Sequence, residues 1–366
     1  MNQDELNYVS LFSGIGGFEL AILQIFPNAR CLASCEIEPN CKQILQRHFP
    51  DHPECQDVKS ADFKHLRGHV DLVVGGSPCK DLSKANTFGR EGLAGAQSSL
   101  FWDFVRCVQE CRPKYFILEN VSSMRGEDKD IITKALGVEP VMLNASAVTC
   151  QKRKRLFWCN FFVAPFPAHS VADDSKDKYG VESKATRARS GARMENADSD
   201  DDGGANEMAE RFLDSTLHRF PSEQNPYSRF LTVPDVLEPK SAVANLGHSQ
   251  RMLDYLFDDS KPIKGHKPGT SRLAAFPYYY RTSNVKERCV GYYIGRGSYD
   301  FWIDERFRPT LYRKGSPREY ERMMGLPDDW TEGVAHSQRL KAIGNAVVPA
   351  VIVYILHWLA LNMEQT

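Results

Sequence analysis

The sequence lacks the two features that would direct it into or across a membrane. A secretory leader opens with basic residues, and Asp4 and Glu5 occupy that place here. The one long apolar run, residues 346–361, is shorter than a comfortable membrane span and contains Pro349 and His357. We therefore expect a protein that is neither secreted nor membrane-bound, and a buried helix over this run.

The sequence also lacks a paired-cysteine framework. Its 10 cysteines include no CxxC pair, and two pairs, Cys31 with Cys35 and Cys107 with Cys111, are spaced CxxxC without accompanying histidines. A structural zinc site needs four Cys or His ligands in a fixed spacing, so we expect no metal, and core packing for these pairs. Free thiols in a chain of this size are typical of a reducing compartment.

An excess of charge of either sign is missing as well. Lys and Arg number 46 against 47 Asp and Glu, a formal net charge of −1. This balance neither requires nor excludes a nucleic-acid partner, so local basic clusters must decide that question. With 366 residues, 42% of them hydrophobic, the chain has an ordinary globular composition and is long enough for two domains.

The first segment predicts a strand, a glycine turn and a helix. Residues 8–12 are apolar, glycines follow at positions 14, 16 and 17, and residues 18–26 have a helical apolar pattern. Such a turn brings backbone amides close to a bound cofactor. The third glycine of the GxGxxG fingerprint is missing, so a simple tight turn is the alternative.

Two acidic residues follow this turn. Glu36 comes directly after a strand over residues 30–35, where a carboxylate can bind a ribose diol. Its alternative is a surface carboxylate near the cap of the helix that begins around Glu38. Asp57 suits either the exocyclic amine of a nucleoside or a turn cap, and the sequence does not separate the two.

The stretch from Val70 to Ser83 reads VDLVVGGSPCKDLS. Its β-branched run, residues 70–74, predicts a strand buried on both faces, and two glycines and a proline then turn the chain. Cys79 therefore lies just past the carboxyl end of a strand, where open α/β sheets hold their ligands. Its thiol is either a small buried hydrophobic group or a nucleophile.

Acidic and basic side chains follow at later strand ends. A strand over residues 114–118 ends at Glu119, whose carboxyl group can reach the same crevice. A strand over residues 141–148 precedes the segment QKRKR. Alternation in an extended segment puts Arg153 and Arg155 on one side and the neighbouring lysines on the other, which suits two inward guanidiniums.

The character of the sequence changes in the middle. Residues 168–209 lose apolar periodicity and are rich in Ser, Asp, Lys and Gly, which predicts a flexible linker or insertion. Residues 211–307 regain aromatic side chains interleaved with arginines, as nucleic-acid surfaces use for stacking and phosphate contact. A small β-rich domain with a tyrosine-rich core is the alternative.

These segments occur in the order found in one protein family. The chain resembles the C5-type DNA cytosine methyltransferases, which use S-adenosylmethionine, through FSGIGG, Glu36, SPCKDLS, ENV, QKRKR, RPTLYRKGSPREYERMMGLPDDW and IGNAVVPAV. The resemblance covers residues 9–162 and 307–366. Lys80 is a departure, because family members most often have Gln after the cysteine.

The resemblance implies an α/β fold. Its core would be a doubly wound, mostly parallel sheet of the S-adenosylmethionine-dependent methyltransferase type, with a second, smaller target-recognition domain. Residues 1–165 and 308–366 would form the catalytic and cofactor-binding domain. Residues 166–209 would be the linker and residues 210–307 the target-recognition domain.

The resemblance also implies catalytic roles. Cys79, as a thiolate, would add to C6 of a cytosine flipped out of the duplex. Glu119, as a carboxylic acid, would hydrogen-bond N3 and the 4-amino group and supply a proton that relieves the ring charge, and Arg153 and Arg155 would contact the ring O2. C5 would then take the methyl group, and loss of the C5 proton would release the thiol. Residues 80–99 would close over the base.

A set of cofactor-binding residues is implied in the same way. Glu36 would hold the ribose, Phe12 and Asp57 the adenine, and Gly14 and Gly16 the methionine part. The other expected residues wall the cofactor site or return from the far end of the chain, where the last helix would pack beside the first. They are Ile15, Ile37, Val58, Pro78, Leu100, Asn345 and Val347.

The expected partner is double-stranded DNA. The enzyme would be a monomer without a metal, cytoplasmic in a prokaryote or virus and nuclear in a eukaryote. Two alternatives stay open: cytosine-5 methylation of transfer RNA, and a catalytically silent DNA-binding protein on the same fold. The large variable middle segment favours DNA, and the joint presence of Cys79, Glu119, Arg153 and Arg155 argues against a silent protein.

Overall fold

The computed structural model describes two long parts of the chain and several short ones. The described residues are 5–54, 56–78, 82, 93, 98–166, 237–247, 279–281, 287–288, 301–308 and 310–365. Cys79, nearly all of the predicted linker and most of the predicted target-recognition domain lie outside them. The domain boundaries expected from the sequence therefore stay predictions.

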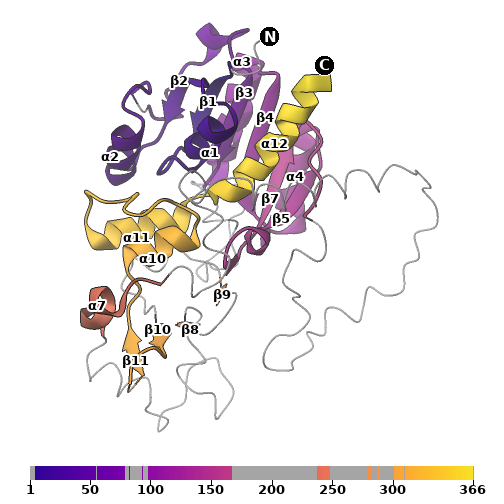
Figure 1. Cartoon of the computed structure of the whole chain (residues 1–366). Coiled ribbons are helices and arrows are strands. Elements are labelled where there is room, and N and C mark those ends of the chain that lie inside the picture. The colour runs from indigo at the N-terminus through magenta and orange to yellow at the C-terminus, as the bar shows by residue number, and fades with distance from the viewer. Residues whose placement is uncertain are drawn as a thin grey trace, which may run out of the picture.

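Six strands form one sheet in the order β2-β1-β3-β4-β7-β5 (Figure 1). The first four strands in this order run parallel, and β7 runs antiparallel to both of its neighbours. The strands are β1 (Asn7–Leu11), β2 (Arg30–Cys35), β3 (Leu72–Gly76), β4 (Tyr115–Val121), β5 (Pro140–Asn144) and β7 (Lys154–Cys159). The predicted mostly parallel α/β sheet is confirmed.

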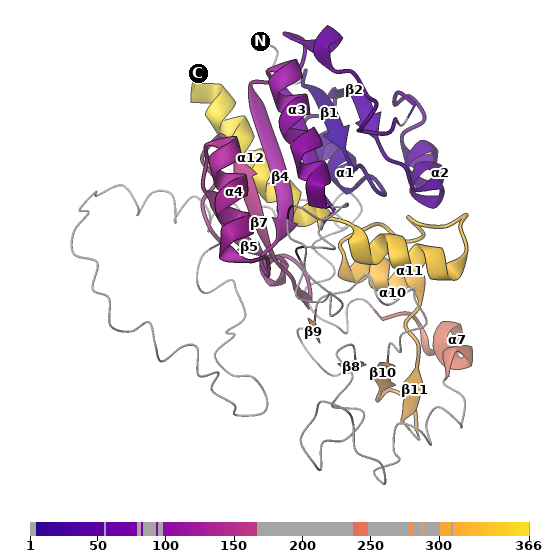
Figure 2. The ribbon, with the colours of Figure 1, turned by 180° about the vertical axis from the view of Figure 1, so that it is seen from behind.

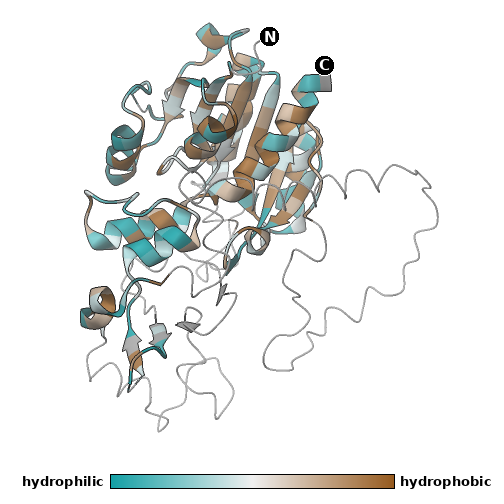
Figure 3. Ribbon diagram, in the orientation of Figure 1, coloured by the Kyte–Doolittle hydropathy of each residue, from teal (hydrophilic) through white to brown (hydrophobic). Residues whose placement is uncertain are grey.

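Helices cover both faces of this sheet (Figures 1 and 2). On one face α1 (Gly17–Ile25) packs against α12 (Pro349–Gln365), and on the other lie α3 (Phe101–Cys111) and α4 (Gly126–Leu136). Successive side chains of a strand point to opposite faces, so the apolar runs of the central strands supply two cores. These strands and α1 are mostly apolar in Figure 3, whereas α10 and α11 are largely polar.

Helix α12 is a core helix. Residues 336–364 are long and apolar enough to cross a membrane by length and composition, but 67% of their most apolar window is buried inside the protein. Ile352, Ile355 and Leu359 have no exposed surface and belong to the same core cluster as α1. This agrees with the buried helix that the sequence predicts.

Strand β5 is shorter than the predicted strand over residues 141–148. It ends at Asn144, whose Oδ1 accepts hydrogen bonds from the backbone N–H groups of Ser146 (3.3 Å) and Arg153 (3.0 Å). A 3₁₀ turn, Ala145–Ala147, follows at once. The prediction ran too long because an asparagine side chain competes locally with the sheet for backbone donors.

A smaller sheet lies apart from the large one, with α10 (Pro317–Met323) and α11 (His336–Asn345) between them (Figure 1). Its strand order is β11-β10-β8, from β8 (Tyr279–Arg281), β10 (Phe301–Asp304) and β11 (Leu311–Arg313). Because β10 pairs with β11, this sheet extends beyond residue 307, where the sequence predicts the target-recognition domain to end. Arg313 joins it to α10, because its buried guanidinium contacts Asp304 at 2.8 Å and Glu319 at 2.7 Å.

Glu19 is an ionisable group enclosed by the large core. It lies in the first turn of α1 and has no exposed surface. Burial raises the pKa of its carboxyl group to about 7, whereas an unfolded chain releases that proton near pH ~4.3. The unfolded state therefore binds fewer protons than the folded state between these values, and the free energy of unfolding falls as pH rises through them.

We expect Glu19→Gln to remove this pH dependence. Between pH ~4.5 and pH ~8 the free energy of unfolding of the wild type should fall by about 3 kcal/mol more than that of the variant. Urea denaturation of both proteins at both pH values measures this difference. Glu139→Gln is the control, at a side chain that is 77% exposed, and its free energy of unfolding should change with pH as that of the wild type does. The same pH dependence in Glu19→Gln would refute the role given to this carboxyl group.

Candidate active site

A pocket partly open to solvent lies where strands β4, β5 and β7 meet the start of α12, with about 230 Å³ of space that includes open solvent. Charged and apolar side chains line it together. The charged residues are Glu119, Arg153 and Arg155. The apolar residues are Leu143, Ala145, Phe157, Val347, Val348 and Val351.

Two of the predicted catalytic residues form an ion pair in this pocket. In the antiparallel register of β4 and β7, Glu119 lies opposite Phe157, and Arg155 is two residues further along the same face. The Arg155 Nε is 2.9 Å from Glu119 Oε1, and the two side chains are 19% and 13% exposed. The sheet register therefore brings together two residues that are 36 positions apart in the sequence.

Gly76 makes room for the Glu119 carboxylate. The two residues are partners in the parallel register of β3 and β4. A Cβ atom on Gly76 would lie 3.1 Å from Glu119 Oε2 and 3.7 Å from Val347 Cγ1. The sequence predicts Gly75 and Gly76 as a turn after a strand over residues 70–74, and this is wrong, because both glycines pair with β4 and belong to β3. Gly76 has no Cβ and so leaves space for the carboxylate.

Asn120 holds the chain at the point where the SPCKDLS segment begins. The residue is 1% exposed, and Nδ2 donates to Ser77 Oγ at 3.0 Å and to the Ser77 carbonyl at 3.3 Å. Ser77 is thus fixed at the same sheet edge as Glu119. Cys79, two residues further on, lies outside the described residues, and its predicted role stays a prediction. Sequence reasoning missed Asn120, although the ENV motif contains it.

Arg153 has a different environment from Arg155. Its side chain lines the pocket, the residue is 4% exposed, and Nη2 donates to the carbonyl oxygens of Ala346 (2.8 Å) and Gly344 (3.3 Å). Arg153 therefore fastens the segment that returns from the far end of the chain. The exposed Asn345 lies between these two carbonyls in the sequence.

The glycine turn and Glu36 form a second site beside the pocket. Gly14 and Gly16 have φ values of 56° and 85°, which glycine adopts without steric cost. The Glu36 carboxylate accepts three backbone N–H bonds, each of 2.8 Å, from Gly14, Ile37 and Glu38. These donors hold the carboxylate at the end of β2, directly against the turn.

Asp57 lies next to Glu36 because Cys35 and Gln56 form a parallel bridge. Its Oδ1 accepts a hydrogen bond from the N–H of Lys59 at 3.0 Å, so Asp57 caps a turn, which is the second of the two roles that the sequence allows. The role of Asp57 toward an adenine stays a prediction.

The other expected cofactor residues differ in exposure. Ile37 is 60% exposed, whereas Ile15 and Val58 are buried. The residues of intermediate burial are Phe12, Pro78, Leu100 and Val347.

Val347 connects the two sites. A Cβ on Gly17, at the start of α1, would lie 2.8 Å from Val347 Cγ2, and the other methyl group of Val347 faces Gly76 and the pocket. The glycine turn and the Glu119–Arg155 pair therefore lie on either side of one valine from the returning segment. This juxtaposition suits a reaction between a group bound at the turn and a ring bound in the pocket.

We expect Glu36→Ala to weaken binding of an adenosyl cofactor by about 10- to 100-fold, because it removes a charged acceptor for a ribose diol and unpairs the Gly14 amide. Calorimetric titration with S-adenosylhomocysteine measures this. Glu38→Ala is the matched control, since Glu38 is the adjacent carboxylate and pairs with Lys341 at 3.1 Å. Equal affinity of Glu36→Ala and wild type would contradict the role of Glu36.

Comparison with known proteins agrees with this geometry. The family described as C-5 cytosine-specific DNA methylase matches residues 6–360. The type II methyltransferase M.Sau3AI of Staphylococcus aureus is 24% identical over 410 residues, covering 96% of this chain and 95% of its own. M.HhaI of Haemophilus parahaemolyticus is also 24% identical, with coverages of 96% and 93%.

A solved structure shares the fold. The Dnmt2 methyltransferase of S. pombe superposes with a TM-score of 0.59 at 16% identity, covering 99% of this chain and 100% of that protein. Because the family match spans nearly the whole sequence, the chain belongs to the C-5 cytosine-specific DNA methylases.

Proposed function

We propose that this protein methylates C5 of cytosine at specific sites in double-stranded DNA, with S-adenosylmethionine as methyl donor. The observation that carries the proposal is the Glu119–Arg155 pair in a pocket that Val347 shares with the glycine turn. The names of the relatives, type II methyltransferases, support the same reaction.

The residues around the turn fit an adenosyl cofactor. Left-handed glycines leave room for close approach, and a carboxylate held by three amides is an acceptor for a ribose diol. Glu36 would hold the ribose, Asp57 the adenine amine, and Gly14 and Gly16 the methionine part. The bound cofactor supplies an electrophilic methyl group on a sulfonium sulfur.

In the proposed reaction Cys79 activates the cytosine ring. The thiolate sulfur bonds to C6, and the electron pair of the C5–C6 double bond makes C5 nucleophilic. Glu119, as a carboxylic acid, donates its proton toward N3 and accepts a hydrogen bond from the 4-amino group, and Arg155 stabilises negative charge that develops on the ring. C5 would then take the methyl carbon of the bound cofactor, whose sulfur would keep the electron pair of the broken bond as a neutral thioether. A base would remove the C5 proton, and the bond from the Cys79 sulfur to C6 would break as the double bond returns.

The cytosine must leave the duplex for this chemistry, because C6 and N3 are enclosed within stacked base pairs. Charged and apolar side chains together line the pocket, which suits the polar edge and the apolar faces of a flipped ring. Arg153, proposed to contact the ring O2, would also hold the returning segment in place, since its Nη2 donates to two carbonyl oxygens of that segment.

Transfer of a labelled methyl group tests the proposal. In parallel incubations with genomic DNA and with transfer RNA, only the DNA should be labelled. Bisulfite sequencing of that DNA should find 5-methylcytosine at one short recurring sequence. Label in transfer RNA alone would replace the proposal with the RNA alternative. Cofactor binding without transfer to either substrate would favour the silent DNA-binding protein.

A further inference from the structure

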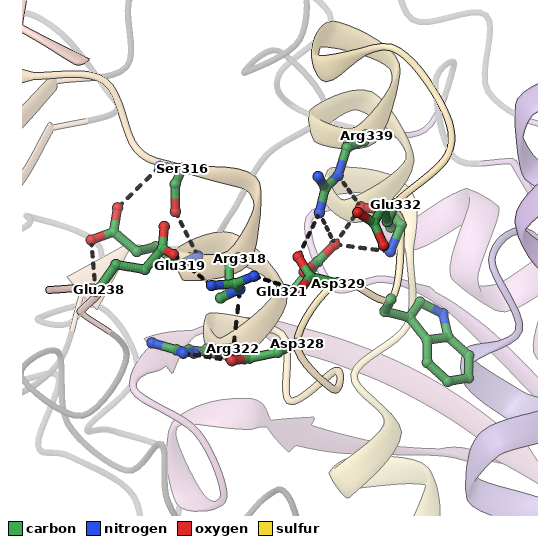
Figure 4. A network of polar contacts seen from close by, with 12 residues as sticks. Glu238, Ser316, Arg318, Glu319, Glu321, Arg322, Asp328, Asp329, Glu332 and Arg339 are labelled. Atoms are coloured by element: carbon green, nitrogen blue, oxygen red, sulfur yellow. Dashed lines mark hydrogen bonds and ion pairs between the residues drawn. The ribbon is translucent and has the colours of Figure 1, made fainter. Parts of the chain in front are cut away.

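The turn over residues 327–333, between α10 and α11, reaches the glycine turn from the far end of the chain. Polar side chains hold it from both helices (Figure 4). On the α10 side Arg318 pairs with Asp329, and Arg322 pairs with Asp328 at 2.6 Å. Asp329 has a φ of 59°, an unusual value for a non-glycine residue, so its ion pair stabilises a backbone shape that the chain would not readily keep alone.

Helix α2 (Pro39–His48) clasps the same turn from the opposite side. The Arg47 guanidinium donates to the carbonyl oxygens of Asp329 (2.7 Å), Trp330 (2.6 Å) and Glu332 (2.5 Å). The His48 ring stacks on the Trp330 indole at 3.5 Å and 4°. Burial lowers the pKa of His48, and its Nε2 lies 2.7 Å from the Trp330 carbonyl, which can only accept.

Trp330 connects the turn over residues 327–333 to the glycine turn through one hydrogen bond. The residue is 6% exposed, and its indole Nε1 donates to the carbonyl oxygen of Ile15 at 2.7 Å. The next N–H along the chain, that of Gly16, donates to Ser13 at 3.0 Å. Since a peptide unit is planar, these two bonds fix the Ile15–Gly16 peptide plane at both of its ends.

A fixed peptide plane matters here because glycines flank it. Gly14 and Gly16 can adopt many backbone conformations, and a turn that orders only on binding lowers affinity for its ligand. We propose that Trp330 is a positioning residue that preorganises the glycine turn for the cofactor. This inference rests on the proposed function, since it takes the adenosyl cofactor as the ligand of the turn.

The test is Trp330→Phe, which keeps an aromatic ring against His48 and removes the indole donor. We expect S-adenosylhomocysteine to bind about tenfold more weakly, the loss corresponding to one hydrogen bond to a buried carbonyl. The KM for S-adenosylmethionine should rise in parallel, while kcat at saturating cofactor stays within about twofold. The KM effect separates positioning of the turn from general damage to the enzyme.

Trp158→Phe is the matched control. Trp158 is fully buried, and its indole donates to Thr133 at 3.0 Å on the opposite face of the sheet. It loses the same kind of bond, so cofactor affinity should not change. Equal affinity of Trp330→Phe and wild type, or an equal loss in Trp158→Phe, would overturn the inference. A wild type that binds no S-adenosylhomocysteine would instead overturn the proposed function.

Arg47→Ala tests the same link from the surface and decides the question if Trp330→Phe fails to fold. Arg47 is an exposed residue whose guanidinium contacts the turn, so its loss should loosen Trp330 and weaken cofactor binding about threefold. Combined with Trp330→Phe it should add less than about twofold, because both changes break one link. Unchanged affinity in Arg47→Ala, or independent effects of the two changes, would contradict the proposal.

Discussion

Cys79→Ala is expected to abolish methyl transfer to DNA while S-adenosylhomocysteine binds within about twofold of its wild-type affinity. The reason is chemical, since none of the described residues that line the pocket has a thiol or hydroxyl group that could add to C6 in place of Cys79. Single-turnover transfer from labelled cofactor and calorimetry measure the two properties on the same preparation. Residual transfer near the wild-type rate would eliminate Cys79 as the nucleophile.

Cys41→Ser is the control for Cys79→Ala. Burial, together with nearby Glu36 and Glu38, raises the pKa of the Cys41 thiol to about 12, so it stays protonated and unreactive. This variant should transfer methyl groups at the wild-type rate.

A DNA substrate with fluorine at C5 adds a direct readout. That carbon has no proton to lose, so the wild type should stay bonded to the DNA under denaturing conditions, and Cys79→Ala should not.

Glu119→Gln should lower the single-turnover rate by about 10²- to 10³-fold with little change in cofactor affinity. The amide keeps the shape of the side chain, but it cannot supply a proton to N3. It also loses the charged contact with Arg155, which is 2.9 Å in the wild type. Rapid-quench measurement with saturating DNA isolates this step from product release.

Two further variants frame the Glu119 prediction. Glu139→Gln breaks an exposed ion pair, in which Lys129 and Glu139 are 3.7 Å apart, and should leave the rate unchanged. Arg155→Lys keeps the charge but loses the planar donor geometry, so it should fall between wild type and Glu119→Gln. A Glu119→Gln rate equal to the wild-type rate would remove Glu119 from the chemistry.

The sheet could be predicted from the sequence because its signals are local. Apolar runs such as residues 70–74 predict strands buried on both faces, and a glycine turn between a strand and a helix predicts the first βα unit. Both elements occur in the structure, although the buried strand is β3, Leu72–Gly76, two residues further along the chain than predicted. Glu36 lies at a strand end as expected. The strand over residues 141–148 was predicted too long, because a pattern of apolar residues does not show that the Asn144 side chain accepts backbone hydrogen bonds and ends the strand.

The candidate site could be predicted only in its residue types. Spacing put Arg153 and Arg155 on one side of a strand, and both line the pocket. It could not separate them, because which guanidinium meets Glu119 depends on the register of β7 against β4, a contact between segments 36 residues apart. That register gives Arg155 the carboxylate and leaves Arg153 to bind two carbonyls of the returning segment.

The sequence by itself determined the order of elements, the family and the set of reactive side chains, because hydrophobic period, glycine turns and motif order are written in neighbouring residues. Only the tertiary structure decided that Gly76 makes room for Glu119, that Val347 stands between the two sites, and that Trp330 binds the Ile15 carbonyl. Each of these contacts joins segments far apart in the chain, so its geometry arises from packing, which local sequence patterns do not encode.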